Sequence, residues 1–595
     1  MEDREMSRMA KRKTSSTQET DEMSVAWNKL PWRKFEQHCF RIQKRIYRAK
    51  QSGNTRKVEK LQKLLLKSEA ARLLAVRRVT QDNQGKKTAG VDGVKSVPPK
   101  ERLVMAQQIH PKYWKHSKRP LPVRRIWIPK PGKPDERRPL GIPVMMERSK
   151  QALVKLALEP AWEAVFEPHS YGFRPGRSCH DAIGAIFLAI KSKPKFVFDA
   201  DIKGCFDNIS HDTLVEKLHT FPQLTHLIKG WLKAGVMEEL HFSPTESGTP
   251  QGGVISPLLM NVALHGMEIA IQEAKYQDGK PIVIRYADDF VVLHPNKEEL
   301  QKAATLATEW LKSMGLWLSP NKTRVTHTLT PHEGNVGFDF LGFTIRQFYV
   351  GKTHTGKSTH GKPLGFKTLI KPSKESIERH TQQIGQVLRK QRNAPQKRVI
   401  RDLNPIIRGW CYYHRWVICT EAFSTCDHIT FLQLCRWEKT RHPNKSKQWV
   451  KEKYFIRVEE RNRFGTYFKD AEGKTKPMYV VSHVDTHHQD YILVRGSSSP
   501  YDGKLLYWGK RLKQHPLVNN EKAKLLQMQK GQCPRCGLYF RDGDLLEVDH
   551  IVPTALGGKD NRSNKWVYHR HCHDEKTAED RARIAKYKAA GINHK

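Results

Sequence analysis

Three aspartates lie where short apolar runs end or turn. Asp201 closes the run FVFDAD (196–201), and Asp288 and Asp289 separate the two apolar halves of IRYADDFVVL (284–293). Such runs predict strands, and the second predicts a β-hairpin. A pair of exposed carboxylates repels itself unless it is solvated or binds cations, and carboxylate oxygens beside substrate phosphates suit Mg²⁺. Two such ions, about 4 Å apart, could activate an attacking 3′-oxygen and clamp a leaving pyrophosphate.

A second group of candidate ligands lies near the C-terminus. Cys533 and Cys536 form a C-x₂-C pair, and His569 and Cys572 form an H-x₂-C pair that begins 33 residues after Cys536. Four sulfur or imidazole ligands in two close pairs suit a tetrahedral structural Zn²⁺. The spacing therefore predicts a small zinc-stabilised module.

The composition indicates a large protein that meets a polyanion. The 595 residues carry 105 Lys and Arg against 61 Asp and Glu, a net charge of +44, and 38% of them are hydrophobic. This charge favours a nucleic-acid partner, and the apolar fraction argues against a disordered basic chain. No apolar stretch approaches the ~20 residues of a membrane span, and the first residues lack the apolar core of a signal peptide. Ten cysteines are too few for a disulfide scaffold, so we expect an intracellular protein without a membrane partner.

The elements that must position these groups fall into an α+β, multi-domain pattern without internal repeats. Segment 33–78 holds 15 basic and 3 acidic residues with apolar residues at helical spacing, which favours an RNA-facing surface over a merely solvated one. Segment 371–453 looks helical, with 18 basic and 7 acidic residues. The predicted order is a disordered tail (1–24), a basic extension (25–100), an α+β region (101–350), a linker (351–370), a helical region (371–453), a β-containing unit (454–514) and the Cys/His module (515–595).

Seven ordered blocks resemble those of reverse transcriptases. YADD (286–289) resembles the catalytic box, DIKGCFDNI (201–209) the box of the first catalytic aspartate, and TPQGGVISPLLMN (249–261) the next block. The others are RRPLGIP (137–143), SYGFRPGRS (170–178), SPNKT (319–323) and FLGF (340–343), and QGKKTAGVDGV (84–94) resembles an amino-terminal extension. From about residue 55 onward, the chain is most similar to bacterial group II intron-encoded proteins. The resemblance implies right-hand fingers and palm followed by an α-helical thumb, the maturase domain.

The resemblance also implies roles at the polymerase site. Asp201, Asp288, Asp289 and the carbonyl of Ile202 would hold two Mg²⁺ ions. Phe206 would exclude the 2′-hydroxyl as a steric gate, with a core aromatic as the alternative. Gln251 would contact the incoming dNTP, and Arg137 and Arg138 would lie over its triphosphate. Lys322 would approach the leaving pyrophosphate, unless it is an ordinary surface lysine. Asp199 and Asp207 are interpreted as structural.

The helical region resembles the maturase domain at IRGWCYYHRW (407–416), where Tyr413 fills the tyrosine position of a GW-x-x-Y signature. Aromatic and basic side chains together can stack on bases and bind phosphates. We expect Trp410 to pack into the core of its own domain. The predicted RNA contacts are Arg398, Arg401, Arg408 and Arg415.

Residues 546–573 resemble an HNH endonuclease, a ββα-metal nuclease. His550 would activate water, Asp549 and His573 would hold Mg²⁺ or Mn²⁺, and Asn564 would orient the loop that positions His550. The family more often has Cys where this chain has His569. The alternative is a zinc-stabilised DNA-binding knuckle without nuclease activity. Residues 454–514 would form a DNA-binding region.

The expected protein is a reverse transcriptase and maturase that binds group II intron RNA, aids splicing, nicks target DNA and extends the new 3′-hydroxyl with dNTPs. We expect it in the bacterial cytoplasm, at the nucleoid when it is on DNA. A host-defence or CRISPR-associated reverse transcriptase and a splicing-only maturase are the alternatives. The oligomeric state does not follow from the sequence.

Overall fold

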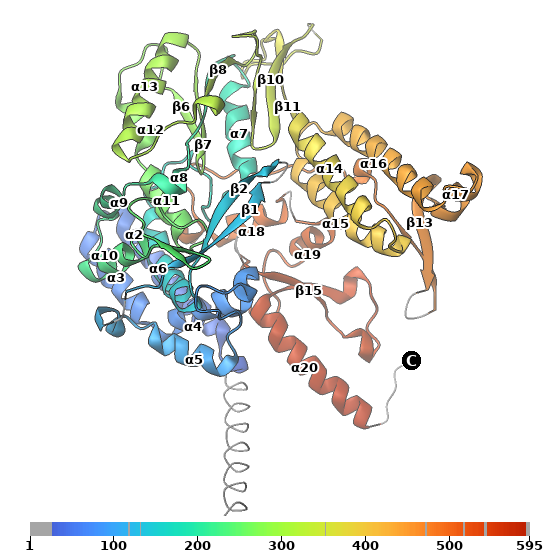
Figure 1. The fold of residues 1–595 in the computed structure, drawn as a ribbon, viewed down its shortest axis with the longest axis horizontal. Coiled ribbons are helices and arrows are strands. Elements are labelled where there is room, and N and C mark those ends of the chain that lie inside the picture. Colours follow the sequence, from blue (N-terminus) through green and yellow to red (C-terminus); the bar gives the residue numbers. More distant parts are fainter. Residues whose placement is uncertain are drawn as a thin grey trace, which may run out of the picture.

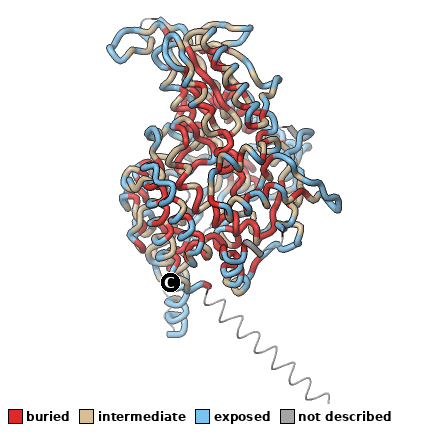
Figure 2. Tube along the Cα trace, turned by 90° about the vertical axis from the view of Figure 1, so that its left-hand side faces the viewer, coloured by how far each residue is buried: buried red, intermediate tan, exposed pale blue. Residues whose placement is uncertain are grey.

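The computed structural model describes residues 27–116, 119–130, 133–351, 353–469, 473–515, 518–540 and 544–590. The tail predicted at 1–24 lies outside these residues. Buried residues run through the centre of the described chain, and exposed ones line its edges (Figure 2). None of the helices in the described part is long and apolar enough to cross a membrane.

Three amphipathic helices open the described chain and pack around α6 (Met145–Glu163): α2 (Trp32–Gln51), α3 (Thr55–Lys67) and α4 (Glu69–Arg77). Ile46, Leu65 and Val76 are fully buried on their inner faces. The predicted helical spacing of 33–78 is thereby confirmed. The chain continues through η1 (Arg78–Asp82), η2 (Gln84–Lys87), α5 (Pro99–Gln108) and η3 (Pro111–His116).

A β-hairpin follows these helices at the centre of Figure 1. Its strands are β1 (Val123–Lys130) and β2 (Lys133–Ile142), with Ile128 opposite Arg138. The short strands β4 (Val236–Glu238) and β5 (His241–Ser243) extend it into a sheet of order β2-β1-β4-β5.

The central sheet has the order β6-β7-β3-β8 and is antiparallel throughout. Alternate side chains enter two different cores, because Val197 and Val291 face one cluster whereas Phe198 and Val292 face the other. The strand ending at Asp201 and the hairpin over 284–293 are confirmed. The strands are β3 (Phe196–Asp201), β6 (Ile282–Tyr286), β7 (Asp289–His294) and β8 (Arg324–His327).

Helices and short turns surround the central sheet. They are α7 (Cys179–Ile190), α8 (Cys205–Asn208), α9 (His211–Leu218), α10 (Pro222–Leu232), α11 (Ser256–Leu264), α12 (Met267–Glu273), α13 (Lys297–Ser313) and η4 (Pro320–Lys322).

A third sheet replaces part of the predicted linker. Strand β11 (Phe366–Pro372) pairs with β10 (Phe343–Tyr349), which also pairs with β9 (Phe338–Phe340). The linker prediction over 351–370 is wrong at its C-terminal end, because Phe366 and Ile370 are buried against this sheet. Only the preceding residues form the loop of the β10–β11 hairpin.

The helical module, on the right of Figure 1, contains α14 (Lys374–Lys390), α15 (Gln396–His414), α16 (Thr420–Arg441) and α17 (Lys447–Tyr454). A sheet of β12 (Phe455–Val458), β13 (Arg461–Lys469) and β14 (Thr475–Tyr479) packs on it. Leu403, Phe464 and Val480 share one buried core. The strands after residue 454 therefore complete the helical module rather than opening a separate unit.

The next segment runs back along the central region through η5 (His483–Asp485), η6 (Pro500–Asp502) and α18 (Leu505–Lys513). Its anchor is the buried carboxylate of Asp181, which accepts hydrogen bonds from Val494 N (2.8 Å), Tyr491 Oη (3.0 Å) and Arg511 Nη2 (2.5 Å). The β-like pattern DYILVRG forms no strand there; its polar groups bind Asp181 instead.

The C-terminal module is a ββα unit preceded by α19 (Asn520–Met528). It consists of β15 (Leu546–His550), η7 (Thr554–Leu556), η8 (Arg562–Asn564), β16 (Lys565–His569) and α20 (Arg570–Ala589). Arg77 Nη2 of α4 donates a hydrogen bond to Asp574 of α20 (3.0 Å), which joins the two ends of the described chain.

Candidate functional site

The three predicted carboxylates meet at one end of the central sheet. Asp201 lies opposite Asp289 in the β3–β7 register, and Asp288 is in the turn between β6 and β7. The amide of Ile202 donates to the carbonyl of Asp288 (3.3 Å), which holds the end of β3 against this turn.

The segment SYGF (170–173) fixes the conformation of this turn. Ala287 has a φ of 60°, and Gly172 packs so closely against it that a Cβ at Gly172 would collide with the Ala287 backbone. The buried guanidinium of Arg285 donates to Asn261 Oδ1 (3.1 Å) and Ser170 Oγ (2.8 Å). The turn conformation is therefore set by contacts with distant blocks of the chain.

The three carboxylates lie so close together that their negative charges disfavour one another. Burial, together with Asp288 and Asp201, raises the pKa of Asp289 to about 8, and burial also raises the pKa of Asp288. Lys322 Nζ donates to Asp201 Oδ2 (2.7 Å), and this bond raises the lysine pKa. Since these carboxylates disfavour one another's charge, their oxygens fit a site for divalent cations.

The arginines predicted to bind the triphosphate are neighbours on β2, so their side chains leave opposite faces of the strand. Arg137 and Arg138 are both exposed, and the positive charge of Arg138 opposes the rise in the pKa of Asp288. Arg138 therefore lies close enough to the carboxylates to stabilise the negative charge of Asp288.

Gln251 is held beside the same hairpin. Its carbonyl accepts from the amide of Gly141 (2.7 Å), and Gly252, with a φ of 120°, allows this close approach. Its side chain donates Nε2 to Asp207 Oδ2 (3.3 Å). Asp207 was predicted to be merely structural, but it orients Gln251. Only its place in the aspartate block could have indicated this.

Asp199 and Phe206 flank the cluster. Asp199 pairs with Arg324 (3.1 Å), as a structural role requires. Phe206 lies on α8 and is half-buried, and its ring meets the ring of Phe173 with centroids 6.1 Å apart.

The GW-x-x-Y segment joins the helical module to the third sheet. Tyr413 donates its hydroxyl to the carbonyl of Leu341 (2.8 Å) and stacks on Phe343 (centroids 5.2 Å apart). Trp410 stacks on His380 at 4.6 Å and donates Nε1 to Ser376 Oγ (3.2 Å). Trp410 thus packs within its own module, as expected.

The four predicted RNA-contact arginines separate into two groups. Arg398, Arg401 and Arg408 are exposed on α15. Arg415 is only 1% exposed, donates Nη2 to the carbonyl of Val518 (2.8 Å) and lies over the ring of Tyr412. Its assignment to RNA is wrong, because the chain before the C-terminal module covers it.

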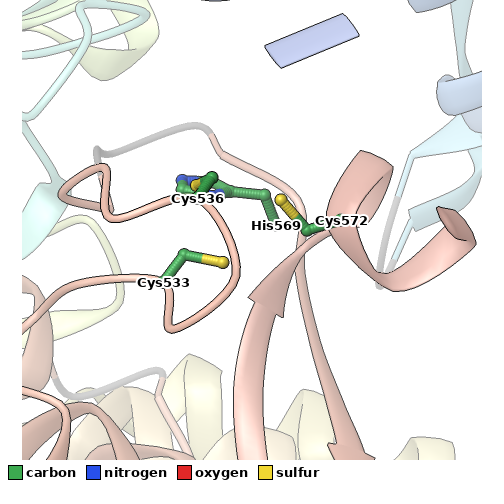
Figure 3. A group of neighbouring side chains, drawn as sticks. All are labelled: Cys533, Cys536, His569 and Cys572. Atoms are coloured by element: carbon green, nitrogen blue, oxygen red, sulfur yellow. Dashed lines mark hydrogen bonds between the residues drawn. The ribbon is translucent and has the colours of Figure 1, made fainter. Parts of the chain in front are cut away.

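The Cys/His pairs converge as the spacing predicts. Cys533 and Cys536 come from one loop, His569 from the end of β16 and Cys572 from the first turn of α20, and their side chains point toward one another (Figure 3). One ligand atom from each lies within 4.8 Å of the others, and all four residues are buried. This donor set could hold a tetrahedral Zn²⁺.

His569, where the family more often has Cys, fits the cluster. Its Nδ1 is 3.2 Å from the sulfur of Cys536, and its Nε2 is 3.4 Å from Asp544 Oδ2. A carboxylate behind a ligating imidazole fixes its tautomer and orientation. Burial disfavours a charged His569, but Asp544 and the thiols of Cys533 and Cys536 raise its pKa to about 12.

The HNH-like residues surround the end of β15. Asp549 Oδ2 is 3.8 Å from His573 Nε2, and His550 Nε2 is 3.0 Å from Asp560 Oδ1. Asn564 accepts from Val552 N and donates to its carbonyl, both at 2.9 Å. It therefore closes the loop that follows His550.

Lys576 was missed by the sequence analysis. Its ammonium lies 3.2 Å from Asp549 Oδ2 and pairs with Asp580, on a largely buried side chain. The available signal was its position three residues after His573, which places both on one face of α20.

Parts of this chain are similar in sequence to known proteins. Protein YkfC of Escherichia coli (strain K12) is 31% identical over 328 residues, which cover 49% of this chain and 83% of YkfC. The group II intron-encoded protein LtrA of Lactococcus lactis subsp. cremoris is 40% identical over 178 residues, 29% of each chain. An uncharacterized 91 kDa protein in the cob intron of Schizosaccharomyces pombe is 27% identical over 378 residues, 51% of this chain and 44% of that protein. The matches thus span less than half of the last two relatives.

Four family models match in the order of the modules. Residues 27–109 match the N-terminal domain of reverse transcriptase and 128–345 match reverse transcriptase (RNA-dependent DNA polymerase). Together with the carboxylate cluster, this defines the chain as a reverse transcriptase. Residues 377–455 match the group II intron maturase-specific domain, and 533–579 match HNH endonuclease. The chain belongs to the group II intron-encoded reverse transcriptases, with a maturase and an HNH domain.

Proposed function

We propose that the central sheet is the palm of a right-hand polymerase that copies RNA into DNA. The sheet of β1 and β2 forms its fingers, and α14–α17 its thumb. The convergence of Asp201, Asp288 and Asp289 at one sheet end supports this most directly. With the Ile202 carbonyl, they would hold two Mg²⁺ ions, which supply charge stabilisation at the attacking 3′-oxygen and the leaving pyrophosphate.

The surrounding side chains orient the nucleotide. Arg137 and Arg138 bind the triphosphate of the dNTP, and Gln251, held by Asp207, contacts the nucleotide. Phe206 lies under the sugar and excludes a 2′-hydroxyl. Lys322, whose ammonium is held at Asp201 Oδ2 (2.7 Å), would approach the leaving pyrophosphate and donate a proton to it.

The RNA partner is group II intron RNA, whose splicing the protein assists. The basic helices within 33–78 and the exposed arginines of α15 form the binding surface, namely Arg398, Arg401 and Arg408. Many phosphate contacts would make this binding strongly dependent on salt.

The C-terminal module nicks one strand of target DNA, and the new 3′-hydroxyl primes cDNA synthesis. His550, oriented by Asp560, takes a proton from the attacking water. Asp549 and His573 would hold Mg²⁺ or Mn²⁺, which stabilises charge on the scissile phosphate, while Zn²⁺ would keep the module folded.

Two alternatives are less well supported. A splicing-only maturase has no use for a complete carboxylate cluster with Lys322 bonded to it. A host-defence reverse transcriptase does not need the maturase-specific domain and the HNH module together.

Primer extension on an RNA template tests the polymerase. Asp288→Ala should abolish DNA synthesis while intron RNA binding stays unchanged, because the carboxylate serves metal binding rather than the fold. Glu246→Ala, which removes an exposed carboxylate outside every proposed site, is the matched control. Synthesis by Asp288→Ala within a few fold of the control would refute the assignment.

A further inference from the structure

Phe173 has two unusual features for a large apolar residue. Its side chain is 51% exposed, and its backbone has a φ of 59°, in the left-handed region that disfavours residues with a Cβ. Strained backbone that persists is held by its surroundings and occurs preferentially at functional sites.

Both neighbours of Phe173 are fixed. Gly172 packs against the catalytic turn, and its carbonyl accepts from Asn261 Nδ2 (2.8 Å). Arg174 is buried and donates to both carboxylate oxygens of Glu163 (2.8 and 3.1 Å). The backbone of Phe173 is thus clamped between the carboxylate cluster and a buried ion pair.

The ring of Phe173 has one aromatic neighbour among the described residues. It meets Phe206 edge to face, with centroids 6.1 Å apart and planes at 76°. Phe173 also lines a cavity of about 520 Å³ between the amino-terminal helices, α6 and the C-terminal module. Phe173 thus contacts Phe206 and also borders this cavity.

We propose that Phe173 is a positioning residue that holds the ring of Phe206 against the sugar and so sets the discrimination between dNTPs and rNTPs. The inference rests on the proposed role of Phe206 as the steric gate. Edge-to-face contact restrains a ring, and a clamped backbone makes that restraint rigid. Without the ring of Phe173, Phe206 loses this restraint and gains freedom to rotate.

A double-mutant cycle tests this on the full-length protein. The measured quantity is kcat/KM for a dNTP divided by kcat/KM for the matching rNTP in single-nucleotide extension. Phe206→Ala should lower the ratio most. Phe173→Ala should lower it by about 2- to 10-fold, the factor that one aromatic pair contributes, mainly by admitting the rNTP. Tyr349→Ala, an exposed aromatic on β10, should leave it unchanged.

The double variant gives the decisive result. If Phe173 acts through Phe206, adding Phe173→Ala to Phe206→Ala should change the ratio no further, and Phe173→Tyr, which keeps the ring, should retain wild-type selectivity. An independent effect in the Phe206→Ala background, or wild-type selectivity of Phe173→Ala, overturns the inference while leaving the gate intact. Unchanged selectivity of Phe206→Ala itself refutes the gate and the inference together.

Discussion

Arg415 offers a direct test of whether position in a motif or position in the fold determines the role of a basic residue. In Arg415→Ala, the carbonyl of Val518 loses a charged donor at 2.8 Å, and Tyr412 loses a cation 4.5 Å from its ring centroid. A hydrogen bond from a charged group contributes about 1.5–3 kcal/mol, and a cation–π contact contributes about 0.5–2 kcal/mol. We therefore expect a local loss of about 2–5 kcal/mol where α15 meets the chain before the C-terminal module.

Limited proteolysis measures this loss of local stability, and an RNA-binding assay tests whether Arg415 also contacts RNA. The rate of cleavage near Val518 should rise by at least about tenfold, because proteases act on the locally opened state. RNA affinity should remain that of the wild type. Arg408→Ala, in α15 seven residues before Arg415, is the matched control and should show the opposite pattern, since Arg408 is exposed. Weakened RNA binding by Arg415→Ala, with protection near Val518 unchanged, would refute the reasoning.

Three further outcomes follow from the sites. Because the pKa of Asp289 is raised to about 8 without metal, Mg²⁺ binding must displace a proton, and calorimetry should show affinity falling as pH drops from 8 to 6; pH-independent binding would contradict this. His550→Ala and Cys533→Ala should both stop DNA nicking, but only Cys533→Ala should also lose bound zinc and protease resistance after residue 515. Replacing the Lys and Arg of 33–78 should flatten the salt dependence of RNA affinity, and an unchanged slope would place the RNA elsewhere.

The catalytic end of the central sheet could be predicted from the sequence because its signals are local. Asp201 ends an apolar run, and Asp288 and Asp289 interrupt another, so strand and turn follow from neighbouring residues. The Cys/His cluster was also predictable, since each of its two short sequence pairs already places two candidate ligands close together. Only the approach of the two pairs needed the fold: just before Cys533, the side chain of Gln529 exchanges two hydrogen bonds with the backbone of Val567 in β16.

What remained unpredictable depends on chain segments that are distant in sequence. Arg415 reads as a surface arginine until Val518, 103 residues later, covers it. The strands after residue 454 look like a unit of their own until Phe464 is found in the core with Leu403. The segment around Tyr491 has a strand-like pattern, but its polar groups serve Asp181. In each case a long-range contact overrides a correct local pattern.

Contacts between distant segments also connect the C-terminal module to the rest of the molecule. The first turn of α20 carries Cys572, a proposed zinc ligand, and His573, a proposed ligand of the nuclease metal. The residues on either side of this pair contact the amino-terminal helices: His571 Nδ1 lies 3.3 Å from Glu36, and Asp574 accepts a hydrogen bond from the buried Arg77. Both partners belong to helices of the basic amino-terminal surface. These two contacts hold the first turn of α20, and with it the proposed nuclease ligands, against α2 and α4. The two ends of the described chain, which share no local sequence signal, are thus joined by a contact pattern that only the fold creates.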